Sequence, residues 1–188
     1  AIEQKSDLQL LDTMQGGGDV AIIIDGPNVA IASSVDAVFV AKIGDINLSD
    51  LKTLLEQPDT IKLCFDLKSL KYILEDIDIQ LQGDIFDVQL AHYLIDAEAR
   101  HRLDFICNAM LNYEPGDAAT QAASLWALYP LLSSQMNEAG LGQLYYNVEL
   151  PLVDVLISME REGVRINVES LRQYSAQLSA ERDVLETE

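Results

Sequence analysis

The chain has 188 residues, of which 49% are hydrophobic, so it is long and apolar enough to fold around a core, and a disordered chain is excluded. Its 12 Lys and Arg against 31 Asp and Glu leave a net charge of −19. A surface this acidic repels phosphate backbones, or simply keeps the domain soluble, so any grip on DNA should come from elsewhere in a longer chain. No apolar run approaches the roughly 20 residues that span a bilayer, and Ala1–Asp7 do not resemble a signal peptide. We expect a cytoplasmic protein with Cys64 and Cys107 as buried reduced thiols.

The first half of the chain predicts a β-rich block. Residues 1–18 are polar and end in Gly16, Gly17 and Gly18, which indicates a linker. Val20–Asp25 is a run of β-branched residues typical of a strand buried on both faces. Further strands are expected at 29–33, 37–43 and 60–65. Asn47 and Asp66 are placed to cap helices that run to about Glu56 and Glu75.

Beyond Gly83 the spacing of apolar residues becomes helical. The pattern appears first in Phe86, Leu90, Tyr93 and Leu94, then in Leu103, Ile106, Met110 and Leu111. Asp117 is placed to cap a helix to about Asn137, a long apolar helix is expected over 144–161, and Asn167 is placed to cap a last helix. Strands followed by helices predict an α/β or α+β sandwich with Val20–Asp25 at its centre.

The C-terminal third carries a long motif. Glu149-Leu-Pro151-Leu152 is followed by an apolar helix and by Met159-Glu160-Arg-Glu-Gly163-Val164-Arg-Ile166-Asn167. This segment resembles the junction into the polymerase domain of family A DNA polymerases. Upstream, the segments 85–96 and 100–107 resemble stretches of the 3′–5′ exonuclease domain of the same family, and the strand at Ala21–Asp25 resembles its first strand.

The resemblance implies a fold and a domain plan. We expect a ribonuclease H-like 3′–5′ exonuclease fold, a mixed β-sheet flanked by helices, followed by long C-terminal helices. Residues 1–18 would be a linker, 19–145 the exonuclease-like domain, and 146–188 the junction and the truncated start of the polymerase thumb.

The resemblance implies a two-metal phosphodiesterase, because that is the chemistry of the family's exonuclease. Such a site needs several carboxylates around two divalent ions. The family supplies them from D-x-E on the first strand, an Asp after N-L-K-Y, and Y-x-x-x-D on a later helix. Here Asp25 matches the first acid, but Pro27 and Leu70 stand at the next two positions. The helix motif aligns with Asp117 and Gln121, so both of its residues are replaced.

A shifted register would pair Tyr113 with Asp117 instead, but Pro115 and Gly116 cannot lie inside a helix. We therefore expect a degenerate site that binds no metal, with no catalytic residue and with Asp25, Pro27, Leu70, Asp117 and Gln121 as vestigial positions.

Other candidate residues favour structural roles. Asp25 is expected in a turn, Asp66 at a cap, and Asp87 and Asp104 at structural positions of the family pattern. His92 and His101 are isolated in the sequence, without metal-ligand spacing. Lys68 and Lys71 are expected on a solvated face and Trp126 in the core. The three glycines precede a strand, so they form no phosphate loop.

The expected function is that of an inert exonuclease-like domain that supports the polymerase of a bacterial DNA polymerase I-type chain. Two alternatives remain open: an active exonuclease that uses Asp25, Asp66, Asp84 and Asp87, and an acidic protein-binding module. The resemblance implies magnesium for the parent polymerase and no cofactor for this fragment. It also implies DNA contacts through the parent chain, no membrane, a bacterial cytoplasm and a monomer.

Overall fold

A computed structural model describes residues 3–5 and 18–187, with side chains for 18–186. Its elements form two compact units, and the boundary between them along the chain falls between Ile157 and Ser158. In the first unit a single mixed sheet, six strands among the described residues, runs in the order β1-β4-β3-β2-β5-β6. The strands are β1 (Glu3–Lys5), β2 (Val20–Asp25), β3 (Asn28–Ala32), β4 (Ala37–Lys42), β5 (Ile61–Cys64) and β6 (Asp84–Asp87).

The expected meander is confirmed, and so is the central place of the first apolar strand. β2, β3 and β4 pair antiparallel, whereas β5 and β6 continue the sheet parallel to β2. Gly26, with a φ of +56°, makes the tight turn between β2 and β3, a backbone region that glycine enters without steric cost. The turn therefore confirms Asp25 as a turn residue at the end of its strand.

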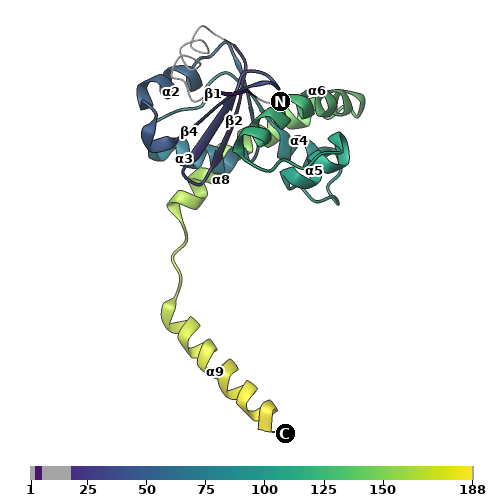
Figure 1. The fold of residues 1–188 in the computed structure, drawn as a ribbon. Coiled ribbons are helices and arrows are strands. Elements are labelled where there is room, and N and C mark those ends of the chain that lie inside the picture. Colours follow the sequence, from purple (N-terminus) through teal and green to yellow (C-terminus); the bar gives the residue numbers. More distant parts are fainter. Residues whose placement is uncertain (1–2, 6–17, 188) are drawn as a thin grey trace. The chain divides into compact units, whose positions relative to one another are not determined.

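Helices cover both faces of the sheet (Figure 1). One face packs against α4 (Val88–Ile95), α5 (Leu103–Leu111) and α6 (Ala118–Glu138). The other packs against α2 (Leu48–Leu55), α3 (Leu67–Asp76) and the first half of α8 (Leu150–Glu162). The remaining elements are a 3-10 turn at Ile43–Asp45, α7 (Gly142–Leu144), a π-helical turn η2 (Tyr145–Glu149) and α9 (Val168–Thr187).

The alternation of side chains along β2 divides the core into two clusters. Ala21 and Ile23 face α6, whereas Val20 and Ile22 face α2 and α3, as successive strand residues must. The side chains of β3 that face α6 are also small, because the buried positions on that face are alanines. Helix α6 meets this face with four buried alanines of its own, Ala118, Ala119, Ala122 and Ala123, so the helix can approach the sheet closely.

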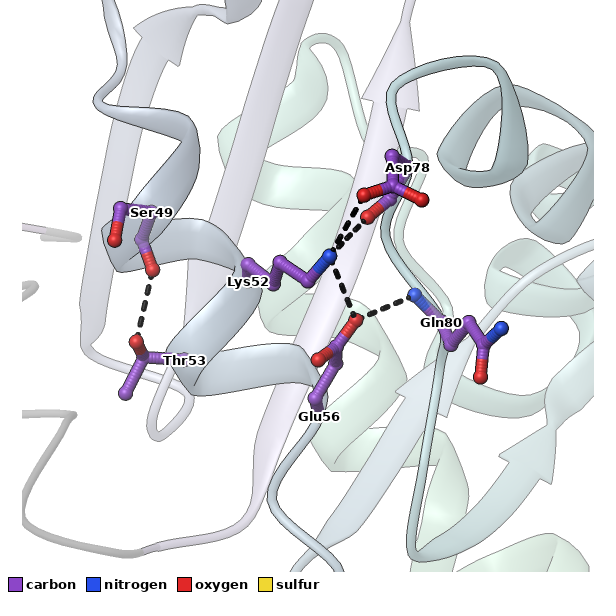
Figure 2. A network of polar contacts seen from close by, with 6 residues as sticks. All are labelled: Ser49, Lys52, Thr53, Glu56, Asp78 and Gln80. Atoms are coloured by element: carbon purple, nitrogen blue, oxygen red, sulfur yellow. Dashed lines mark hydrogen bonds and ion pairs between the residues drawn. The ribbon is translucent and has the colours of Figure 1, made fainter.

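Polar contacts fasten α2 to the segment that follows α3 (Figure 2). Lys52 Nζ lies 2.7 Å from the carbonyl oxygen of Asp78 and 2.9 Å from its carboxylate. Glu56 accepts a hydrogen bond of 2.9 Å from the backbone N–H of Gln80, and Thr53 donates to Ser49 O one turn earlier. These contacts are exposed, so they position the segment more than they stabilise the fold.

Two expectations about elements are wrong. Residues 1–18 are not linker throughout, because Glu3–Lys5 pair in parallel with β4; Gly16 and Gly17 lie outside the described residues. Phe86 belongs to strand β6 rather than to a helix, and α4 begins two residues later. The helix expected over 144–161 is confirmed as a continuous helical segment, with a π-helical turn at Tyr145–Glu149.

The expected helix caps at Asn47, Asp66 and Asp117 are confirmed by hydrogen bonds to the first turns of α2, α3 and α6. Both cysteines are buried and free, as expected. Within the described part of the chain, no helix is long and apolar enough to cross a membrane.

Candidate functional site

The carboxyl end of β2 opens into a pocket of about 230 Å³. Its wall is formed by the end of β2, by Phe65 and Asp66 after β5, by the first turns of α3 and by one residue of α6. Carboxyl ends of strands in an open α/β sheet are where ligands usually bind. Three positions identified in the sequence, Asp25, Leu70 and Gln121, meet in this pocket.

The chemistry of this pocket does not fit a pair of divalent ions. Leu70 is 5% exposed and presents an apolar side chain, and Gln121 presents a neutral amide. The carboxylates in the wall are those of Asp25 and Asp66. Hard divalent ions need more carboxylate oxygens than this, and no group of three possible ligands occurs among the described residues.

Asp66 has a structural task of its own. Its carboxylate accepts hydrogen bonds from Ser69 N at 3.1 Å and from Ser69 Oγ at 2.6 Å. It begins α3 from a left-handed backbone conformation, with a φ of +58°, which Asp tolerates better than most residues because its short side chain bonds locally. The carboxylate of Asp66, which lines the pocket after β5, thus serves as the N-cap of α3.

Two of the positions that the sequence singled out lie outside the pocket wall. Pro27 lies in the exposed turn after β2, so its side chain does not extend the face of β2 that carries Asp25. Asp117 forms a capping box with Thr120, whose backbone N–H lies 2.8 Å from the Asp117 carboxylate. Asp117 therefore caps α6. In the alternative register that pairs it with Tyr113, the two side chains do not lie on one helix, because α6 begins at Ala118.

Asp87 is buried and holds three elements together. Its carboxylate accepts hydrogen bonds from Leu67 N, at 2.9 Å, and from the first turn of α4, where Gln89 N also lies at 2.9 Å. Burial raises the pKa of the Asp87 carboxyl to about 6, against the opposing effect of these backbone N–H groups. Asp87 is a structural residue, as expected, and Asp84 is exposed at the start of β6. Neither of these two acids lines the pocket around Asp25.

A second pocket of about 420 Å³ shares Phe65 and Gln121 with the first. Its outer wall comes from Gln89 on α4, from His101 and from the start of α5. Asp104, which lies in this wall, is paired with Arg102 at 2.7 Å; the paired guanidinium and the backbone N–H of Phe105 outweigh desolvation and lower the pKa of Asp104.

The two histidines were expected to be isolated, but the fold brings them into contact. His92 Nδ1 and His101 Nδ1 lie 2.9 Å apart in a hydrogen bond, although nine residues separate them. Since the two Nδ1 atoms point at each other, they do not converge on a shared metal ion. The contact depends on how the loop after α4 folds back, which no local sequence spacing reveals.

Comparisons with known proteins agree with this fold. Residues 25–114 match the family described as DNA polymerase I, ribonuclease H-like domain. The chain is 28% identical over 148 residues to a DNA polymerase I of Geobacillus stearothermophilus, covering 66% of this chain and 17% of that protein. A DNA polymerase I of Chloroflexus aurantiacus is 43% identical over 65 residues, which are 31% of this chain and 7% of that protein.

Solved structures show the same architecture. The POL domain of Pol1 from M. smegmatis, in complex with a DNA primer-template and dNTP, superposes with a TM-score of 0.75 at 21% identity, covering 100% of this chain and 36% of that one. Brucella melitensis NrnC bound to pGG gives 0.71 at 18% identity, covering 87% and 94%. RNase D of Escherichia coli gives 0.65 at 11% identity, covering 85% and 51%. At these identities the likeness concerns the fold alone.

Proposed function

Since residues 25–114 of this chain match the family described as DNA polymerase I, ribonuclease H-like domain, we propose that the chain is a 3′–5′ exonuclease-like domain that has lost catalysis and serves as a scaffold for its polymerase. The observation that carries the proposal is the pocket where Asp25, Leu70 and Gln121 meet. Two of these three positions are uncharged, and the remaining carboxylate cannot assemble a two-metal site.

The scaffold half of the proposal is supported by the way α8 is fastened. Val153 and Ile157 of α8 are buried in the core cluster of α2 and α3, and Asp154 pairs with Lys71 of α3. Tyr145, just upstream, is fully buried and bonded to the backbone of Asp87. The first half of α8 is thus part of the packed domain, as a scaffold role requires.

The chain spans about 17% of the length of the first two curated relatives that it matches, so the activity of the whole protein is part of the proposal. We place the chain within a bacterial DNA-directed DNA polymerase of the cytoplasm that acts as a monomer and uses magnesium in its polymerase domain. Residues 146–188 lead into that domain. The parent chain, rather than this acidic fragment, contacts DNA.

The test of inactivity is a nuclease assay. The purified chain is incubated with a 5′-end-labelled single-stranded DNA and magnesium or manganese, and the products are resolved by length. We expect the substrate to stay intact. A preparation of Asp25→Ala, purified in the same way, controls for contaminating nucleases.

The outcomes separate the possibilities. Degradation by both preparations identifies a contaminant, and purification is repeated until the Asp25→Ala preparation is silent. Degradation by the native chain alone contradicts the proposal, because Asp25 would then support catalysis with displaced acids.

A further inference from the structure

The contact between His92 and His101 has no part in the proposed function. His92 lies on α4, and His101 lies in the loop between α4 and α5. Their Nδ1 atoms are 2.9 Å apart, and Gln89 Nε2 also reaches the backbone oxygen of His101 at 3.0 Å. The ring of Tyr93 packs edge-on against His101. The loop is thus held to one turn of α4 by imidazole and amide contacts.

The short distance restricts how many protons the pair can carry. A hydrogen bond between two Nδ1 atoms needs one N–H donor and one lone pair. The neutral pair satisfies this, and so does the pair with one extra proton. When both rings are protonated, both Nδ1 atoms carry hydrogens, and two hydrogens do not fit between nitrogen atoms 2.9 Å apart. The doubly protonated pair must therefore separate.

The surroundings favour one arrangement of the neutral pair. His101 Nε2 is shielded from solvent and has no hydrogen-bond partner. A shielded N–H costs more than a shielded lone pair, so we assign the proton of His101 to Nδ1, with His92 Nδ1 as the acceptor. His92 then carries its proton on Nε2.

Charged groups surround the pair on α4, on the loop and in the wall of the 420 Å³ pocket, where Glu114 lines the same space as His101. Burial and the neighbouring His101 lower the pKa of His92, while Asp96 at the end of α4 opposes them. On the loop side, Arg102 is engaged with Asp104, and the guanidinium of Arg100 lies over the ring of Phe105. Helix α6 packs against α4 through its apolar side chains.

We propose that His92 and His101 form an acid-sensitive latch that holds the loop of residues 96–102 against α4 and releases it when both imidazoles are protonated. His101 and Arg102 line the 420 Å³ pocket beside α5. Release of the loop therefore moves one wall of that pocket. The latch is a property of the domain itself and does not depend on the loss of nuclease activity.

These are the two histidines of the chain, so nitrogen-15 NMR of the imidazoles can follow each without overlap once a single variant assigns them. At about pH 7.5, one unit above the ordinary imidazole pKa, we expect His92 Nδ1 unprotonated and His101 Nδ1 protonated. On acidification the wild-type pair should titrate in two steps. In His101→Gln the remaining His92 should titrate in one step and at higher pH than the second wild-type step. Two independent, coincident titrations in the wild type contradict the latch.

Amide hydrogen exchange tests the release. Relative to the intrinsic exchange rate, we expect exchange over residues 96–102 in the wild type to become faster between about pH 7.5 and about pH 5, by on the order of tenfold, the ratio of one pKa unit. In His92→Gln/His101→Gln, which lacks the titratable pair, the same comparison should show no change with pH. Exchange over 118–138 in the same samples serves as the internal reference. Asp87 is present in both chains, so its titration cancels. An equal response to pH in both chains contradicts release, and His101→Gln replaces the double variant if the latter fails to fold.

Discussion

At the scale of single residues, a buried lysine determines how β5 begins. Lys62 is fully buried on a strand, and its ammonium donates to the backbone oxygens of Gln57 and Thr60. Burial lowers the pKa of Lys62, while Asp19 and Asp84 oppose this effect. Gly83 closes over the same carbonyl groups with a φ of +87°. A side chain at position 83 would therefore clash with backbone atoms and would require an unfavourable positive φ.

We predict that Gly83→Ala is strongly destabilising. A Cβ at this position would lie 2.5 Å from Thr60 O and 2.9 Å from Gln57 O, both backbone atoms, so the loop and the lysine must shift. The loss should exceed about 2 kcal/mol, since overpacking and a strained φ add. Gly26→Ala is the matched control, because φ is also positive there but nothing lies within 4 Å; its cost should stay near 1 kcal/mol. Urea unfolding of the two variants measures both, and equal losses would contradict the steric account.

Asp87 predicts a pH dependence with a definite sign. Burial raises its pKa from 3.8 to about 6, so the folded state binds the proton more tightly than the unfolded state. The contribution of this carboxyl to stability is therefore present below pH 3.8 and is lost as the pH rises to about 6. A shift of this size corresponds to about 3 kcal/mol at most.

Asp87→Asn should flatten this part of the stability profile. The amide cannot accept at both former oxygen positions, so the N–H of Leu67 or those of α4 lose a partner. At about pH 4, where the folded state carries the protonated acid, we expect a loss of about 1–3 kcal/mol, the cost of a buried unsatisfied donor. The loss should shrink toward pH 7, where the wild type no longer has the contribution of its raised pKa. Unfolding free energies of wild type and variant between about pH 4 and 7 provide the measurement, because the other carboxylates cancel in the difference. Parallel stability profiles of wild type and variant would exclude Asp87 as the source of the pH dependence.

At the scale of elements, the π-helical turn before α8 has an identifiable cause. Leu150 N–H bonds to Tyr145 O, five residues earlier. The next residue, Pro151, has no N–H to donate, and its ring crowds the carbonyl one turn back. Widening the turn is one way in which a helix accommodates such a residue. The wide turn begins at Tyr145, which is the point where this segment is fixed to β6.

Tyr145 should carry much of this attachment. Its hydroxyl accepts from Asp87 N at 2.6 Å and donates to Asp87 O at 3.2 Å. Tyr145→Phe leaves both backbone groups unsatisfied in the core, and we expect a loss of about 1–3 kcal/mol. The neighbouring Tyr146 is 50% exposed, so Tyr146→Phe should change stability by less than about 0.5 kcal/mol. Thermal unfolding of the two variants compares them directly; a similar loss for both would show that the hydroxyl of Tyr145 is not special.

At the scale of the whole molecule, three positions that the sequence singled out lie in one pocket although they are far apart along the chain. Asp25 comes from a strand, Leu70 from α3 and Gln121 from α6, and the fold brings them to one pocket. The sheet and its flanking helices, rather than any local motif, bring these positions together. The pocket now has a largely apolar wall, which disfavours hydration and ion binding.

Restoring a single acid should not restore metal binding. We expect Pro27→Glu to bind no manganese, because this residue lies in the turn and outside the pocket wall. Leu70→Asp adds a third carboxylate inside the pocket, beside Asp25 and Asp66, and should give weak binding at most, since the residues of a metal site act as a unit. Titration calorimetry with manganese distinguishes the two variants. Tight binding by the unmodified chain would overturn this view of the pocket.

The sequence by itself determined the order of most elements and the identity of the family. Apolar runs and cap residues are local signals, so the strands around Val20–Asp25 and the caps at Asn47, Asp66 and Asp117 could be predicted, with shifts of a residue or two at the ends. The motif also fixes the spacing that places Pro27 and Leu70 where the family has acids, and this replacement stays a prediction from the sequence.

The tertiary structure alone decided what depends on neighbours. Phe86 fits a helical pattern, but pairing with β5 makes it part of a strand, because hydrogen bonds between strands outweigh local spacing. The burial of Lys62, the contact of Tyr145 with Asp87 and the meeting of His92 with His101 join residues through the folded chain. These contacts come from packing of distant segments, and no periodicity along the sequence encodes them.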